Sequence, residues 1–120
     1  MPFAPDNIPR AQALAELLCA AAYSDDELDA DERDAVKKEL AALLGPLHPD
    51  VETHVDRFDR RRFELTAVLT RINASGVDEK RAVMRGVRSI IKADGAVREV
   101  ESNFLAKVGH LLRIPPNDID

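Results

Sequence analysis

Apolar residues recur every three or four positions along almost the whole chain, which is the spacing of one face of an α-helix. No segment alternates between apolar and polar residues for long enough to predict a β-strand. The pattern predicts helices over residues 10–23, 30–44, 49–58, 62–73, 78–93 and 100–112. We therefore expect an all-α fold, a compact bundle of about six to seven helices.

Turn and capping residues set the expected helix ends. Asp29 is the expected N-cap of the second helix, with Glu32 three positions later as the second half of a capping box. Gly45 and the following proline should end that helix. Gly76 and the preceding serine are expected to end the fourth helix, and Asp78 is expected to cap the fifth.

One pattern occurs twice, in residues 22–32 and again in residues 91–101. In each copy an apolar helix runs into an Asp, an aliphatic residue follows three positions later, and a Glu opens the next helix. The matched pairs, all at one offset, are Asp25 with Asp94, Leu28 with Val97, and Glu32 with Glu101. The repeat predicts two pseudo-symmetric helix–acidic turn–helix hairpins, at about 10–44 and 78–113, within a single domain spanning 1–120. If they pack about a pseudo-two-fold axis, the two acidic turns lie side by side.

Composition narrows the class of protein. At 120 residues and 45% apolar content the chain can bury a core of its own, so a disordered chain is not expected. The single cysteine, Cys19, excludes an internal disulfide, and its apolar neighbours indicate a small buried side chain. No apolar run reaches the ~20 residues that a membrane span requires, and the first residues lack a secretory signal pattern. A cytoplasmic location is expected, with peripheral attachment to the inner face of the membrane as a variant.

Four acidic residues of the repeat are the candidate metal ligands: Asp25, Glu32, Asp94 and Glu101. Carboxylates without histidine or cysteine are hard oxygen ligands, so they favour Ca²⁺ or Mg²⁺ over zinc. The four would supply enough ligands only if the two turns converge. The competing interpretation needs no ion, because an acid in a first helical turn is stabilised by capping and by the helix dipole. Both interpretations stay open at the level of sequence.

Basic residues form a second candidate surface. On the fifth expected helix they fall at steps of four, three and four, which places them along one face: Arg81, Arg85, Arg88 and Lys92. Residues 57–62 add four more arginines. This is either a solvated face or a docking surface for an acidic protein or for anionic lipid headgroups. A net charge of -5 and the lack of interleaved aromatic residues argue against nucleic acid as a partner.

Motifs for catalysis are missing from the sequence. None of the serines lies in a nucleophile motif, and there is no phosphate-binding loop or dinucleotide fingerprint. His48 and His54 belong to a polar helix start and lack the spacing of a zinc helix. We therefore expect a protein without catalytic activity.

The second copy of the repeat, residues 90–97 followed by Glu101 and by Phe104, resembles the tellurite-resistance TerB-like family. Residues 22–28 with Glu32 are similar to that family's first turn, although Asp26 stands where the second turn has Gly95. The likeness extends from about residue 14 to residue 114. It implies a compact α-helical domain, paired acidic turns that bind metal, and a role in stress response or as an accessory module.

These observations predict a non-catalytic TerB-like binding module with a divalent-cation site at its paired acidic turns. The alternative is a metal-independent interaction or scaffold domain that uses its basic face. A metal-assisted hydrolase is the remote third reading, since paired carboxylates can transfer protons.

Overall fold

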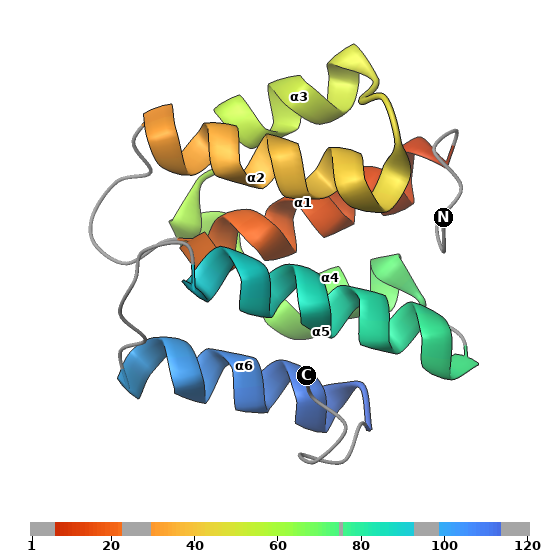
Figure 1. Ribbon diagram of the computed structural model, residues 1–120, viewed down its shortest axis with the longest axis vertical. Helices are drawn as coiled ribbons and strands as arrows, with labels where there is room; N and C mark the ends of the chain where they lie inside the picture. Colours follow the sequence, from red (N-terminus) through yellow and green to blue (C-terminus); the bar gives the residue numbers. More distant parts are fainter. Residues whose placement is uncertain (1–6, 23–29, 75, 93–98, 114–120) are drawn as a thin grey trace.

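A computed structural model describes residues 7–22, 30–74, 76–92 and 99–113. These residues form six α-helices and one short 3-10 helix, and they contain no strand, so the expected all-α class is confirmed (Figure 1). In chain order the elements are α1 (Ile8–Ala22), α2 (Ala30–Leu44), α3 (Pro49–Asp56), η1 (Arg60–Arg62), α4 (Leu65–Ile72), α5 (Gly76–Lys92) and α6 (Glu99–Leu111).

Helix α1 is the centre of the bundle and contacts α2, α3, α4, α5 and α6 (Figure 1). Its residues are buried on almost every side rather than along one stripe, which is typical of a central core helix. Leu14, Leu17 and Leu18 are essentially inaccessible, and burying each leucine contributes about 1.5–3 kcal/mol of transfer free energy. The many alanines of α1 allow the neighbouring helices to approach closely.

The other helices face α1 with apolar stripes. In α2 the stripe consists of Val36, Leu40, Leu43 and Leu44, at the helical spacing expected from the sequence. In α5 it includes Val83, Met84, Val87, Ile90 and Ile91. None of the described helices combines the length and the apolar character needed to cross a bilayer.

Four helix starts differ from the sequence prediction. Helices α1 and α6 begin slightly earlier than residues 10 and 100, at Ile8 and Glu99. The fourth helix begins at Leu65 rather than at residue 62, because Arg62 belongs to η1 and Glu64 forms the N-cap. The Glu64 carboxylate accepts hydrogen bonds from the backbone N–H groups of Thr66 (3.4 Å) and Ala67 (2.6 Å). Helix α5 begins at Gly76, so Asp78 lies within its first turn instead of capping it. Gly76 takes a positive φ of 78°, a conformation that glycine adopts without a steric penalty.

The predicted bounds of α2, residues 30–44, are confirmed at both ends. Gly45, with φ 86°, accounts for the C-terminal stop, because a left-handed residue after the last turn ends an α-helix. Asp29 and the turn residues 23–29 and 93–98 lie outside the described residues.

Candidate functional site

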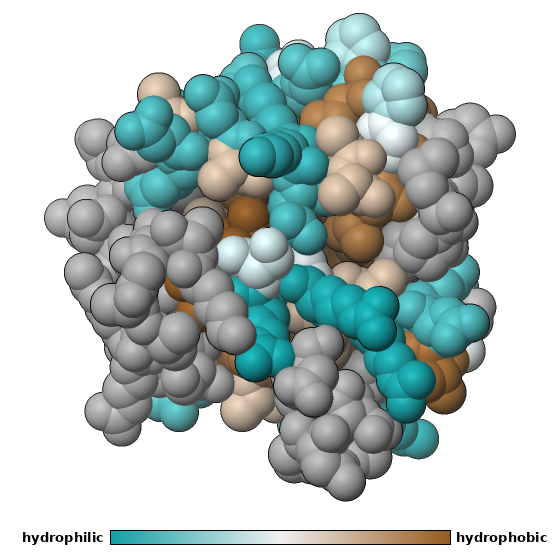
Figure 2. All heavy atoms as spheres, viewed as in Figure 1, coloured by the Kyte–Doolittle hydropathy of each residue, from teal (hydrophilic) through white to brown (hydrophobic). Residues whose placement is uncertain are grey.

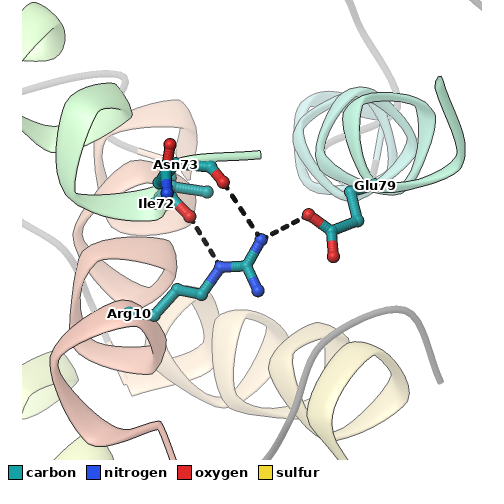
Figure 3. Close-up of polar contacts among 4 residues, drawn as sticks. All are labelled: Arg10, Ile72, Asn73 and Glu79. Carbon is teal, nitrogen blue, oxygen red and sulfur yellow. Dashed lines mark hydrogen bonds and ion pairs between the residues drawn. The ribbon is translucent and has the colours of Figure 1, made fainter. Parts of the chain in front are cut away.

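The two helices that lead into the acidic turns, α1 and α5, run parallel to each other. Near their N-terminal ends Arg10 Nη2 pairs with Glu79 Oε1 at 2.5 Å (Figure 3). Further along, a Cβ atom placed on Gly86 would lie 3.4 Å from Leu18 Cδ2, so Leu18 packs against Gly86. The first contact joins the starts of the two helices and the second joins their later halves, so both helices run in the same direction. Their C-terminal ends therefore lie at the same end of the molecule (Figure 1).

The register of this parallel pair matches the sequence repeat. Arg10 and Glu79 are separated by 69 positions, and the repeat relates Asp25 to Asp94 by the same offset of 69. Equivalent positions of the two copies thus lie at nearly equal heights along α1 and α5. This arrangement fits a pseudo-two-fold axis that runs along the two helices.

The Arg10 side chain links three helices, α1, α4 and α5 (Figure 3). Its Nε donates to the Ile72 carbonyl oxygen at 2.6 Å, and Nη2 donates to the Asn73 carbonyl oxygen at 3.4 Å, besides pairing with Glu79. The Arg10 and Glu79 side chains are only 17% and 21% exposed. The guanidinium therefore ties the first turn of α1 to the end of α4 and to the first turn of α5.

Helix α2 packs antiparallel against α5. Ser89 Oγ donates to Glu39 Oε2 at 3.0 Å, and a Cβ on Gly86 would lie 3.2 Å from Leu43 Cδ1. Later residues of α5 thus meet earlier residues of α2. From the level of the Ser89–Glu39 contact, α5 continues to Lys92 while α2 extends back to Glu32 in the same direction. With a rise of 1.5 Å per residue, Glu32 lies about 6 Å beyond the level of Lys92. The first turn of α2 and the C-terminal end of α5 therefore lie at similar heights along these two helices.

Glu32 is the one predicted metal ligand whose side chain the structure describes. It lies in the first turn of α2, is half-buried and already takes part in a polar interaction. Asp25 and Asp94 lie outside the described residues, as does the side chain of Glu101, although Glu101 itself belongs to the first turn of α6. Within the described part of the chain no group of three or more His, Cys, Asp or Glu side chains is arranged to hold a metal ion.

The basic row on α5 is less uniform than the sequence suggested. Arg85 is exposed, whereas Arg81 and Arg88 are half-buried and engaged in interactions. The side chain of Lys92 lies outside the described residues. On the face shown in Figure 2, hydrophilic side chains form a band along α5 across the middle of the molecule.

Cys19 is a fully buried residue of α1, as its apolar neighbours predicted. Burial raises the pKa of Cys19 to about 12, because the thiolate would lose its hydration. The thiol is therefore protonated at neutral pH, which is typical of an unreactive buried cysteine.

A comparison with models of protein families tests the family resemblance that the repeat suggested. The family model described as tellurite resistance protein TerB matches residues 11–120, nearly the whole chain. The chain belongs to the TerB family. The match spans both hairpins of this TerB domain and the segment between them, so the resemblance noted in the two acidic turns extends through α3 and α4 as well. No curated protein and no solved structure matches the chain at a significant level.

The structure also contains a second polar cluster, between α1, α3, η1 and α4, that the sequence did not predict. Glu16 of α1 accepts from Arg71 Nη1 at 2.5 Å, and its Oε2 lies 3.5 Å from His54 Nε2. These residues are far apart in sequence and share no motif. The run of arginines at 57–62 was the one signal in the sequence that pointed to this region.

Proposed function

We propose that this TerB domain is a non-catalytic binding module whose paired acidic turns hold one divalent cation, with Ca²⁺ or Mg²⁺ as the favoured ion. The ligands are Asp25 and Glu32 from the first turn, and Asp94 and Glu101 from the second. We place the protein in the cytoplasm, with a role in stress response.

The observation that carries the proposal is the register of α1 against α5. The two helices pack in parallel at the same offset as the repeat, so the helix ends that precede the two acidic turns in sequence lie at one end of the bundle. The antiparallel packing of α2 on α5 supports it further, since it brings Glu32 near the level at which α5 ends. Carboxylates from two turns can then supply the six to eight oxygens that Ca²⁺ prefers, together with backbone carbonyls and water.

Thermal unfolding tests the proposal. The domain is first treated with a chelator and then measured with millimolar Ca²⁺, Mg²⁺ or Mn²⁺, beside the double variant Asp25→Asn/Asp94→Asn. An ion at about 100 times its dissociation constant adds about 2.7 kcal/mol, which corresponds to a rise of about 10 °C in Tm for a domain of this size. The matched control is Asp34→Asn, which removes an exposed carboxylate of α2 outside the four ligands.

We expect one of the ions to raise Tm in the wild type and in Asp34→Asn but not in the double variant. If no ion raises the Tm of the wild type, the cation site is wrong. An equal rise in all three proteins would also contradict it, because the ion would then bind elsewhere.

The second candidate is a metal-independent interaction domain that docks an acidic protein through its basic face. Two observations favour it: the hydrophilic band along α5 (Figure 2) and the exposure of the Arg85 side chain on that helix. Titration of the domain with an acidic peptide, in the wild type and in Arg85→Glu, tests this candidate. We expect the charge reversal to weaken binding severalfold, and equal affinity in both proteins would rule out α5 as the docking surface.

A further inference from the structure

A pocket of about 510 Å³ opens beside the cluster around Glu16, at a distance in sequence from both acidic turns. Its lining residues come from α1, α3, η1 and the segment between α3 and η1: Glu16, His54, Arg57, Phe58, Asp59 and Arg62. The segment from α3 to η1 lies between the two hairpins and belongs to neither copy of the repeat. The volume is within the range of pockets that hold small organic ligands.

Both carboxylates in the wall are already neutralised by basic neighbours. Glu16, 20% exposed, is paired with Arg71 and approached by His54, as described above. Asp59 accepts a hydrogen bond from the backbone N–H of Arg61 at 3.0 Å, and its carboxylate also lies 3.4 Å from Arg61 Nε and 3.9 Å from Arg62 Nε. The backbone hydrogen bond from Arg61 lowers the pKa of Asp59, with smaller contributions from the Arg61 side-chain hydrogen bond and from the charges of Arg61 and Arg62, so this carboxylate stays ionised.

The arginines outnumber these carboxylates. Arg61 and Arg71 each engage one carboxylate, which leaves Arg57 and Arg62 to supply a surplus of two positive charges at the pocket. Arg57 is the C-cap of α3 and is exposed, and its guanidinium has no hydrogen-bond or ion-pair partner among the described residues. Arg62 makes one long contact with Asp59 and its side chain is 89% exposed. Both guanidiniums are therefore available to an anion in the pocket.

We propose that this pocket binds a small organic dianion of the phosphate-monoester class. A dianion matches the surplus of two charges, and the planar guanidinium fork forms paired hydrogen bonds with phosphate oxygens. The half-buried Phe58, whose ring lies 6.2 Å from that of Phe63, supplies an apolar wall for the organic part of the ester. The site shares no residue with the cation site proposed above, so either can be correct without the other.

Calorimetric titration with phenyl phosphate tests the proposal, with inorganic phosphate and malonate as comparison anions. The variants are Arg57→Gln and Arg62→Gln, and the matched control is Lys107→Gln, which removes an exposed positive charge of α6 outside the pocket lining. We expect saturable binding of phenyl phosphate that either pocket variant weakens about tenfold, a change of about 1.4 kcal/mol, while the control leaves it unchanged. Thermal unfolding of each variant verifies that it is folded.

Three results would overturn the proposal. The first is no saturable binding of phenyl phosphate to the wild type at millimolar concentration. The second is equal weakening by Lys107→Gln, which would mean that the anion is attracted by any exposed positive charge and not by this pocket. The third is binding of malonate or inorganic phosphate as tightly as phenyl phosphate, which would remove the phosphate ester as the recognised group.

Discussion

Arg10 pairs with Glu79 between the first turns of α1 and α5 and also donates to the end of α4, so removing its guanidinium should destabilise the domain. In Arg10→Gln the Glu79 carboxylate loses this charge partner, and the Ile72 carbonyl oxygen loses the donor that lies at 2.6 Å (Figure 3). Hydrogen bonds to charged groups contribute about 1.5–3 kcal/mol, and breaking a fully buried ion pair costs about 3–5 kcal/mol. Because both side chains keep about a fifth of their exposure, we expect a loss of about 2–3 kcal/mol.

Urea unfolding and thermal unfolding measure this loss. A change of 2–3 kcal/mol in the free energy of unfolding corresponds to a fall in Tm of about 8–12 °C for a domain of this length. A double-mutant cycle with Glu79→Gln isolates the pair, and we expect a coupling free energy of about 1–2 kcal/mol. Arg85→Gln is the control, since substitution of an exposed arginine should change stability by less than about 0.5 kcal/mol.

Two results would refute this reasoning. A loss below about 0.5 kcal/mol for Arg10→Gln would mean that the polar contacts of Arg10 do not stabilise the fold. A coupling free energy near zero would mean that Arg10 acts through its contacts with the end of α4 and not through Glu79.

Three further predictions follow from burial and capping. Leu40→Ala removes a completely buried side chain of α2 and should cost about 2–5 kcal/mol in urea unfolding, whereas a similar loss in the exposed Lys38→Ala would contradict this explanation. Glu64→Ala removes the cap of α4 and should cost about 1 kcal/mol, and unchanged stability would show that the cap is dispensable. Since the folded-state pKa of Cys19 is raised from 9.0 to about 12, the unfolded thiol ionises first, so stability should fall as pH rises from about 9 to about 12. Cys19→Ala should lack this part of the decline, and rapid labelling of the native thiol at pH 8 would contradict its burial.

Much of the fold follows from local pattern. The bounds of α2 were predictable because its apolar stripe and the Gly45 stop are both visible in the sequence. The start of α4 was not, because a side-chain cap by Glu64 and a 3-10 turn of arginines look like helix in a periodicity analysis. The start of α5 was misplaced because Gly76 suits the end of one helix as well as the beginning of the next.

The two candidate sites depend on tertiary contacts. The sequence suggested the cation site but contained no motif for the pocket beside Glu16. The repeat made the cation site a reasonable hypothesis, but the parallel register of α1 and α5 is visible only in contacts such as Arg10 with Glu79. The pocket beside Glu16 had no comparable signal. Its lining residues run from Glu16 of α1 to Arg62 of η1, and a single helix sequence cannot show which face of another helix it meets.

The central position of α1 also has a consequence for how the chain is synthesised. Because α1 contacts α5 as well as α2, α3 and α4, its apolar surface stays partly uncovered until residues 76–92 have left the ribosome. At about 5–20 residues per second, the interval between the synthesis of Ala22 and that of Lys92 is roughly 4–14 s. During that time a nascent helix rich in leucine and alanine is open to chaperones and to other nascent chains. The vulnerable step in the biogenesis of this domain is therefore the arrival of its fifth helix.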